Sequence, residues 1–62
     1  MNRKEAKKIK KGTIVIVKDY QGEYKVVHIQ YGNNRICFWL DNGDLVCHKR
    51  IERVVTEEGG IE

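Results

Sequence analysis

Four side chains of this 62-residue chain have the chemistry to ligate a metal or to act as nucleophile and base. They are the thiols and imidazoles of Cys37, Cys47, His28 and His48. A thiol beside an imidazole can support nucleophilic catalysis, and four such ligands can hold a zinc ion. The chain has no Cys-x2-Cys pair to pre-organise zinc, no serine and no glycine-rich phosphate loop. We therefore expect no enzyme activity, no catalytic residue, no metal and no cofactor.

The two cysteines flank the strongest hairpin signal of the chain. Apolar, β-favouring runs at 35–40 and 45–48 are joined at Asn42-Gly43, a dipeptide preferred in two-residue type I′ turns. Such a turn pairs Asp41 with Asp44 and thereby fixes the register of both strands. This register places Cys37 and Cys47 on opposite faces, which argues against a disulfide and against a shared metal site.

Alternation along the two strands then sorts their side chains into two faces. The expected core face carries Ile36, Phe38, Leu40, Leu45 and Cys47. The expected opposite face carries Arg35, Cys37, Trp39, Val46, His48 and Arg50. The second face holds the single tryptophan among cationic and titratable groups.

Trp39 has two possible environments. The alternation favours a partly exposed indole, which can stack on a nucleobase, hold a cation or anchor a protein partner. The alternative is that bending of the sheet buries Trp39 in a second cluster with Val46 and Cys37. The two readings give this side chain either a binding role or a packing role.

The remainder of the chain predicts one small all-β domain with a thin core. Further strands are expected at 13–17, 24–30 and 53–55, with turns at 19–23 and 31–34 and a helical turn at 49–52. Five short strands, tight turns and one helical turn before the last strand favour a small, strongly bent antiparallel barrel.

This order resembles the SH3-like barrels, particularly the Tudor and KOW groups, over residues 12–55. The resemblance rests on the Gly12 entry, Gly22-Glu23-Tyr24, the hairpin from Phe38 to Asp44, and Val46, Ile51 and Val54. It implies a five-stranded barrel, and such barrels often serve in transcription or translation. Tudor domains also read methylated ligands through an aromatic cage. Trp39 with Tyr20 or Tyr24 would supply only part of one, so methyl reading is not expected.

Charge is unevenly placed along the chain. Twelve Lys and Arg oppose nine Asp and Glu, which gives a net charge of +3 and a pI near 9.0. Residues 1–11 are lysine-rich, with Asn2 and Glu5 spaced to cap a short helix. We expect a basic, flexible arm at 1–11, an SH3-like barrel at 12–56 and an acidic, glycine-containing tail at 57–62. The arm either follows phosphates or an acidic partner, or is a solvated tail.

The sequence thus favours a small non-enzymatic module that engages nucleic acid or a transcription or translation assembly. The expected contact residues are Lys10, Lys11, Arg35, Trp39, His48, Lys49 and Arg50. The alternative is a protein-interaction module, such as a phage- or plasmid-type inhibitor or adaptor, with a homodimer as a further possibility. Reduced cysteines and the lack of a signal peptide or long apolar run favour a cytoplasmic location without membrane contact.

Overall fold

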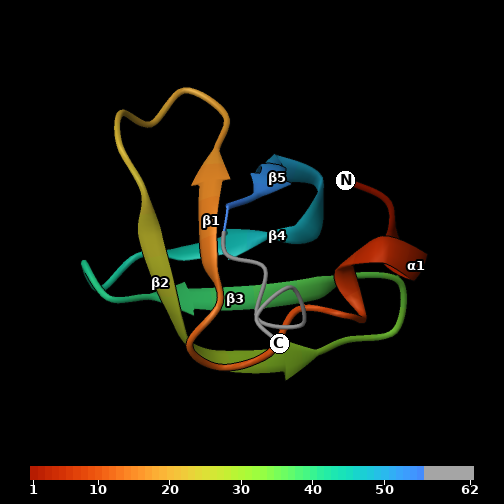
Figure 1. The fold of residues 1–62 in the computed structure, drawn as a ribbon. Coiled ribbons are helices and arrows are strands. Elements are labelled where there is room, and N and C mark those ends of the chain that lie inside the picture. The colour runs from red at the N-terminus through yellow and green to blue at the C-terminus, as the bar shows by residue number, and fades with distance from the viewer. Residues whose placement is uncertain (56–62) are drawn as a thin grey trace, which may run out of the picture.

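The computed structural model describes residues 1–55, which form one open sheet of five antiparallel strands and one short α-helix (Figure 1). The elements are α1 (Arg3–Ala6), β1 (Ile14–Val17), β2 (Tyr24–Tyr31), β3 (Ile36–Leu40), β4 (Leu45–Cys47), the 3-10 turn η1 (His48–Arg50) and β5 (Ile51–Val54). The strand order is β4-β3-β2-β1-β5. The predicted all-β class, the five strands and the helical turn before the last strand are confirmed. The expected tail at 57–62 lies outside the described residues.

Strand β2 joins the two parts of the sheet, one of which contains β1 and β5 and the other β3 and β4. Its first residues pair with β1, and its residues from Val26 onward pair with β3. The register shifts between Val26 and His28, so that Val27 is an extra residue in the strand. Such a bulge bends a strand and increases its twist. Figure 1 shows β2, in olive, running beside β1 in its first half and turning to run below β3 in its second half, so that β1 and β3 run in clearly different directions.

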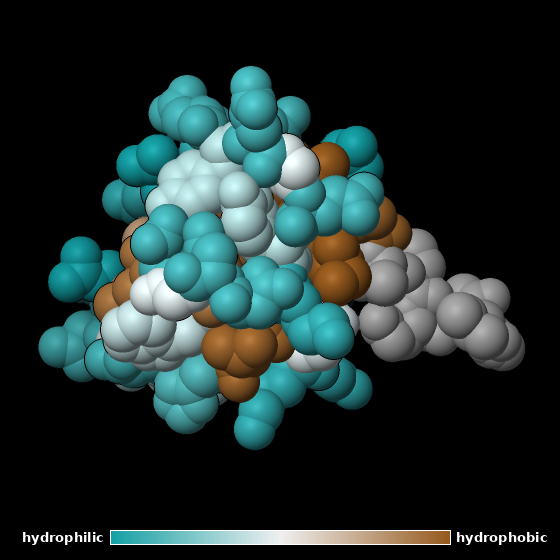
Figure 2. Space-filling view, turned by 90° about the vertical axis from the view of Figure 1, so that its left-hand side faces the viewer, coloured by the Kyte–Doolittle hydropathy of each residue, from teal (hydrophilic) through white to brown (hydrophobic). Residues whose placement is uncertain are grey.

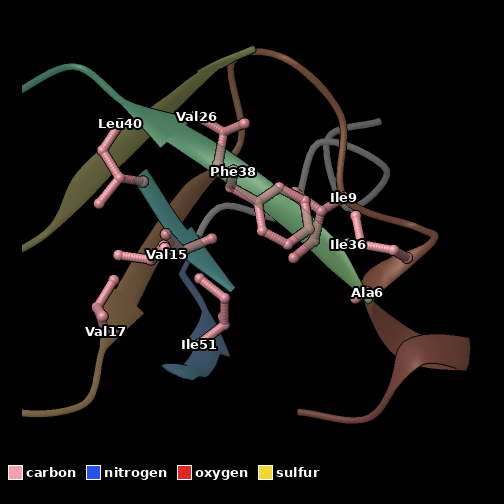
Figure 3. Close-up of a cluster of buried hydrophobic side chains, with 10 residues drawn as sticks. Ala6, Ile9, Val15, Val17, Val26, Ile36, Phe38, Leu40 and Ile51 are labelled. Carbon is pink, nitrogen blue, oxygen red and sulfur yellow. The ribbon is translucent and has the colours of Figure 1, made fainter. Parts of the chain in front are cut away.

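The core lies where side chains from these two parts meet (Figure 3). It contains Ala6, Ile9, Val15, Val17, Val26, Ile36, Phe38, Leu40, Val46 and Ile51, of which none is more than 6% exposed. Burial in β3 alternates strictly, as the period of a strand with one solvated face requires. The core positions expected in β3 are therefore confirmed.

The N-terminal segment is part of this core, and the expected flexible arm at 1–11 is not confirmed. The Asn2 side chain accepts a hydrogen bond of 2.8 Å from the Glu5 amide and so caps α1. Ala6 and Ile9, three residues apart, are 1% and 3% exposed, and Figure 3 shows Ile9 beside Phe38. The segment is thus anchored by its only two apolar side chains after Met1.

The β3–β4 loop differs from the expected type I′ turn. The Leu40 amide donates to the Asp44 carbonyl at 2.9 Å, and the Gly43 amide donates to the Leu40 carbonyl at 2.9 Å. Within the loop only Gly43 has a positive φ, of 93°, whereas a type I′ turn needs two such residues. The pattern is that of a type I turn followed by a G1 bulge. The Asn42 side chain supports it by accepting a hydrogen bond of 3.0 Å from the Asp44 amide.

This loop shifts β4 by one residue, and the expected register is wrong. The observed partners are Trp39 with Leu45, Phe38 with Val46, and Cys37 with Cys47. A one-residue slip moves every side chain of a strand to the other face. Leu45 and Cys47 therefore leave the expected core face, whereas Val46 and His48 are buried, with 6% and 3% exposure.

Substitution of Ile9 tests whether the N-terminal segment belongs to the core. Ile9→Ala is expected to lower the free energy of unfolding by about 2–5 kcal/mol, and Ile9→Val by about 0.5–1.5 kcal/mol, because buried methyl groups are lost. Urea unfolding followed by the fluorescence of the single tryptophan measures both. The exposed neighbour Lys8 is the control, and Lys8→Ala should stay within about 0.5 kcal/mol of the parent. Equal, small effects at Ile9 and Lys8 would mean that the segment does not pack.

Candidate functional site

The solvent-facing side of β2, β3 and β4 carries six side chains in two rows, which we call the outer face. The first row is His28, Trp39 and Leu45, and the second is Gln30, Cys37 and Cys47. His28, Gln30 and Leu45 are exposed, whereas Trp39 and both cysteines are half-buried. The indole therefore has an accessible part, and it lies beside an imidazole and an exposed leucine rather than beside Val46.

A hollow of about 530 Å³ lies at the end of the second row. It is lined by Gly32, Asn33, Asn34, Arg35, Cys47 and Lys49. The turn between β2 and β3 is held by a hydrogen bond of 2.8 Å from the Gly32 amide to the Arg35 carbonyl. Arg35 and Lys49 are both exposed, and among residues 1–55 neither the outer face nor the lining of the hollow includes an Asp or Glu. The site therefore has a local excess of positive charge.

The structure brings together only part of the expected contact set. Arg35 and Lys49 meet at the hollow, and Cys47 joins the hollow to the outer face that carries Trp39. Lys10 and Lys11 are exposed in the turn between α1 and β1, where the Thr13 hydroxyl accepts a hydrogen bond of 3.1 Å from the Lys10 amide. Neither lysine is among the residues that line the hollow.

Arg50 faces a different group of charges. Its Nη2 lies 3.5 Å from Asp19 Oδ2 and 3.5 Å from the Lys18 carbonyl oxygen. Although both side chains of this ion pair are well exposed, the carboxylate offsets part of the arginine charge. Arg50 is therefore a weaker candidate for anion binding than Arg35 or Lys49, which share the hollow with no carboxylate from residues 1–55.

The end of the molecule that carries the β3–β4 loop is polar. The Tyr20 hydroxyl donates a hydrogen bond of 2.9 Å to Asp44, which raises the pKa of Tyr20 above its ordinary value. The rings of Tyr20 and Tyr24 pack edge to face, with centroids 5.5 Å apart. Figure 2, which views the side where this loop lies, shows mostly hydrophilic side chains with hydrophobic patches between them. Tyr20 therefore connects the β1–β2 loop to the β3–β4 loop.

His48 is not a surface contact residue, contrary to expectation. It is 3% exposed, and its Nδ1 accepts a hydrogen bond of 3.2 Å from the Ile36 amide. Strand β4 ends at Cys47, so the ring takes the acceptor position that a further strand residue would have offered to Ile36. Burial lowers the pKa of His48, and the charges of Lys49, the Met1 ammonium and Arg3 lower it further. The folded protein thus favours a neutral ring.

Metal binding and membrane insertion receive no support from the described part of the chain. Among residues 1–55, no group of three or more His, Cys, Asp or Glu side chains is placed to hold a metal ion. No helix in the same range is long and apolar enough to cross a membrane.

Sequence reasoning missed four residues of the site. Leu45 and Cys47 were not expected on the outer face, because their position depends on the register of β4. Asn33 and Asn34 were not expected in the lining of the hollow, because their position depends on the geometry of the β2–β3 turn.

Acidification should destabilise the fold through His48. Its folded pKa lies below the ordinary value of 6.5, so its contribution is complete above that pH and is lost as the pH falls toward the folded pKa. Urea unfolding between about pH 7.5 and pH 5 should show the loss. His48→Asn, whose Oδ1 can accept from the Ile36 amide, should flatten this profile, whereas His28→Asn at an exposed position should not. An unchanged slope in His48→Asn would contradict the assignment.

A scan of protein-family models, a search of curated proteins and a search of solved structures found no match to this chain. Its fold and its outer face are therefore described from its own residues. The function that they support rests on the placement of Trp39, Arg35 and Lys49 together with general physical chemistry.

Proposed function

We propose that this chain is a small non-enzymatic binding module with an SH3-like barrel, and that it binds nucleic acid through the outer face and the hollow. The strand order β4-β3-β2-β1-β5 supports the barrel, as do the bulged β2 and η1 before β5. Strand β1 pairs with both β2 and β5, so the first and last strands lie side by side. This is the arrangement that the resemblance to Tudor and KOW domains implies.

The observation that carries the proposed activity is a pair of cations at the end of a face that carries a partly accessible indole. Arg35 and Lys49 line a hollow to which the described residues contribute no carboxylate, and Cys47 connects it to the face of Trp39. Cations neutralise phosphates and release counterions, while an indole stacks on bases of any sequence. The amides of Asn33 and Asn34 add hydrogen-bond donors and acceptors to the same lining. These groups suit a single-stranded nucleic acid.

Charge around this site extends beyond the two lining cations. Residues 1–55 hold all twelve Lys and Arg and only six of the nine Asp and Glu. The Met1 ammonium and Arg3 act on the same buried imidazole as Lys49, and α1 contacts η1, so the N-terminal charges lie near the end of β4. The Met1 ammonium also donates a hydrogen bond of 3.1 Å to the Ile51 carbonyl, so this charge is held in place. A positive region of this kind attracts polyanions over several ångströms.

The proposed activity predicts salt-dependent binding to single-stranded oligonucleotides. Fluorescence anisotropy should show that Arg35→Gln and Lys49→Gln each weaken binding and each reduce the slope of log K against log salt by about 1. Lys25→Gln is the matched control, because it removes the same charge about 20 Å along β2 from Gly32. Trp39→Ala should weaken binding by about 10- to 100-fold through loss of base stacking. Binding without salt dependence, or equal loss in the Lys25 control, would overturn the proposal.

Protein docking is a second candidate, favoured by the exposed apolar end of the outer face. Leu45 is 45% exposed and lies on β4, which is an edge of the sheet beside Trp39. An edge strand offers unpaired backbone groups to an added strand, and the leucine offers apolar contact. The partner in this case is a nucleic-acid-associated protein or a second copy of the chain.

Leu45→Lys separates the two candidates. It should abolish a protein complex or homodimer, because an ammonium group at the centre of such a contact is costly to desolvate. It should leave oligonucleotide binding intact or slightly stronger. Light scattering measures the oligomeric state, and capture from a nuclease-treated cell lysate measures protein binding. A complex that survives this substitution would place the docking surface elsewhere.

A further inference from the structure

The two cysteines face each other across the β3–β4 hairpin. Cys37 and Cys47 are direct partners in the observed register, and both are half-buried and free. Under the type I′ register they would have lain on opposite faces. The one-residue shift therefore reverses the argument against a bond between them.

The hydrogen-bond pattern shows which kind of pair they form. Leu40 and Asp44 are a hydrogen-bonded pair, because the Leu40 amide donates to the Asp44 carbonyl. Hydrogen-bonded and non-hydrogen-bonded pairs alternate along an antiparallel ladder, so Cys37 and Cys47, three pairs away, are non-hydrogen-bonded. The amide of Ile36, one residue before Cys37, points to the next position of the ladder, where the His48 ring accepts it. This agrees with the alternation.

The spacing of a non-hydrogen-bonded pair suits a disulfide. The Cα atoms of such a pair are about 4.5 Å apart, and their side chains lie on the same face. Disulfides join residues whose Cα atoms are about 4.4–6.8 Å apart. We propose that Cys37 and Cys47 are a site of thiol–disulfide exchange, which closes to a cross-strand disulfide with a low-molecular-weight disulfide and reopens with a low-molecular-weight thiol. This proposal does not depend on nucleic-acid binding.

The hollow determines the order of the exchange. Cys47 lines the hollow, so its sulfur meets a small reagent first. The Cys47 thiol loses its proton to solvent, since His48 Nδ1, 3.5 Å away, already accepts the Ile36 amide. The thiolate attacks one sulfur of the reagent, RSSR, whose S–S bond breaks and releases RS⁻. The Cys37 thiolate then attacks the Cys47 sulfur and expels the second RS⁻. Two protein thiols are oxidised and RSSR is reduced to two RSH after protonation.

Equilibration in glutathione buffers tests the site. The full chain is incubated with glutathione disulfide and glutathione at several ratios. The exchange is quenched with acid, free thiols are alkylated, and the mass of the product is measured by mass spectrometry. The expected main product is a monomer lighter by two hydrogen atoms that takes up no alkyl group and whose peptide map joins residues 37 and 47. Excess glutathione should restore two alkylatable thiols. Mixed disulfides with glutathione, or disulfide-linked dimers, as the main product would overturn the proposal.

Two controls separate this geometry from the mere presence of two thiols. Leu45→Cys combined with Cys47→Ser keeps two cysteines on the outer face but places them diagonally, about 7–8 Å apart, beyond the usual reach of a disulfide. Its ratio of internal to mixed disulfide should be at least roughly 10-fold lower than that of the parent. The parent chain in urea provides the same comparison without a substitution, because unfolding separates the pair. Ratios equal to that of the native parent in both controls would overturn the proposal.

Discussion

The hydrogen bond from the Leu40 amide to the Asp44 carbonyl sets the register on which the candidate sites depend. It exists because Gly43 adopts a φ of 93°, which a residue with a Cβ reaches only at a cost. The resulting three-residue loop pairs Phe38 with Val46 and thereby completes the core beneath the hairpin. A two-residue loop would have directed Cys47 inward and Val46 outward.

The same register separates the roles of adjacent residues at the end of β4. Cys47 faces the hollow, whereas His48 faces inward and binds the Ile36 amide. A buried neutral imidazole in this position satisfies a backbone donor that would otherwise be unpaired, which matters because an unsatisfied buried amide costs as much as a lost hydrogen bond. His48 therefore acts on the candidate site indirectly, by holding the ends of β3 and β4 together.

The elements of the fold could be predicted from the sequence because β-branched runs and turn residues are local signals. The register could not, because Asn42-Gly43 suits a type I′ turn and also a type I turn with a G1 bulge, and the choice depends on whether Val46 or Cys47 fills the core. The packing of the N-terminal segment could not be predicted for a related reason. Lysine dominates its composition, but burial depends on Ala6 and Ile9 alone, whose partners are distant in the chain.

The candidate site was predictable only in part. Arg35, Lys49 and Trp39 could be named from residue type, whereas Arg50 and His48 could be assigned only once their partners were known. Asp19 lies 31 residues from Arg50, and Ile36 lies 12 residues from His48. Local patterns do not report contacts at such separations, and the direction of a side chain in η1 is set by those contacts.

The pair of cations that lines the hollow is itself an argument for anion binding. Lys49, Arg3 and the Met1 ammonium each lower the pKa of His48, so each of these positive charges acts on the same buried ring. Arg35 and Lys49 share a hollow whose lining, in the part of the chain that the structure describes, holds no carboxylate. Like charges held together repel one another and reduce the stability of a domain with so thin a core. A bound phosphate would relieve this repulsion, and folded chains tend to place such local conflicts at functional sites.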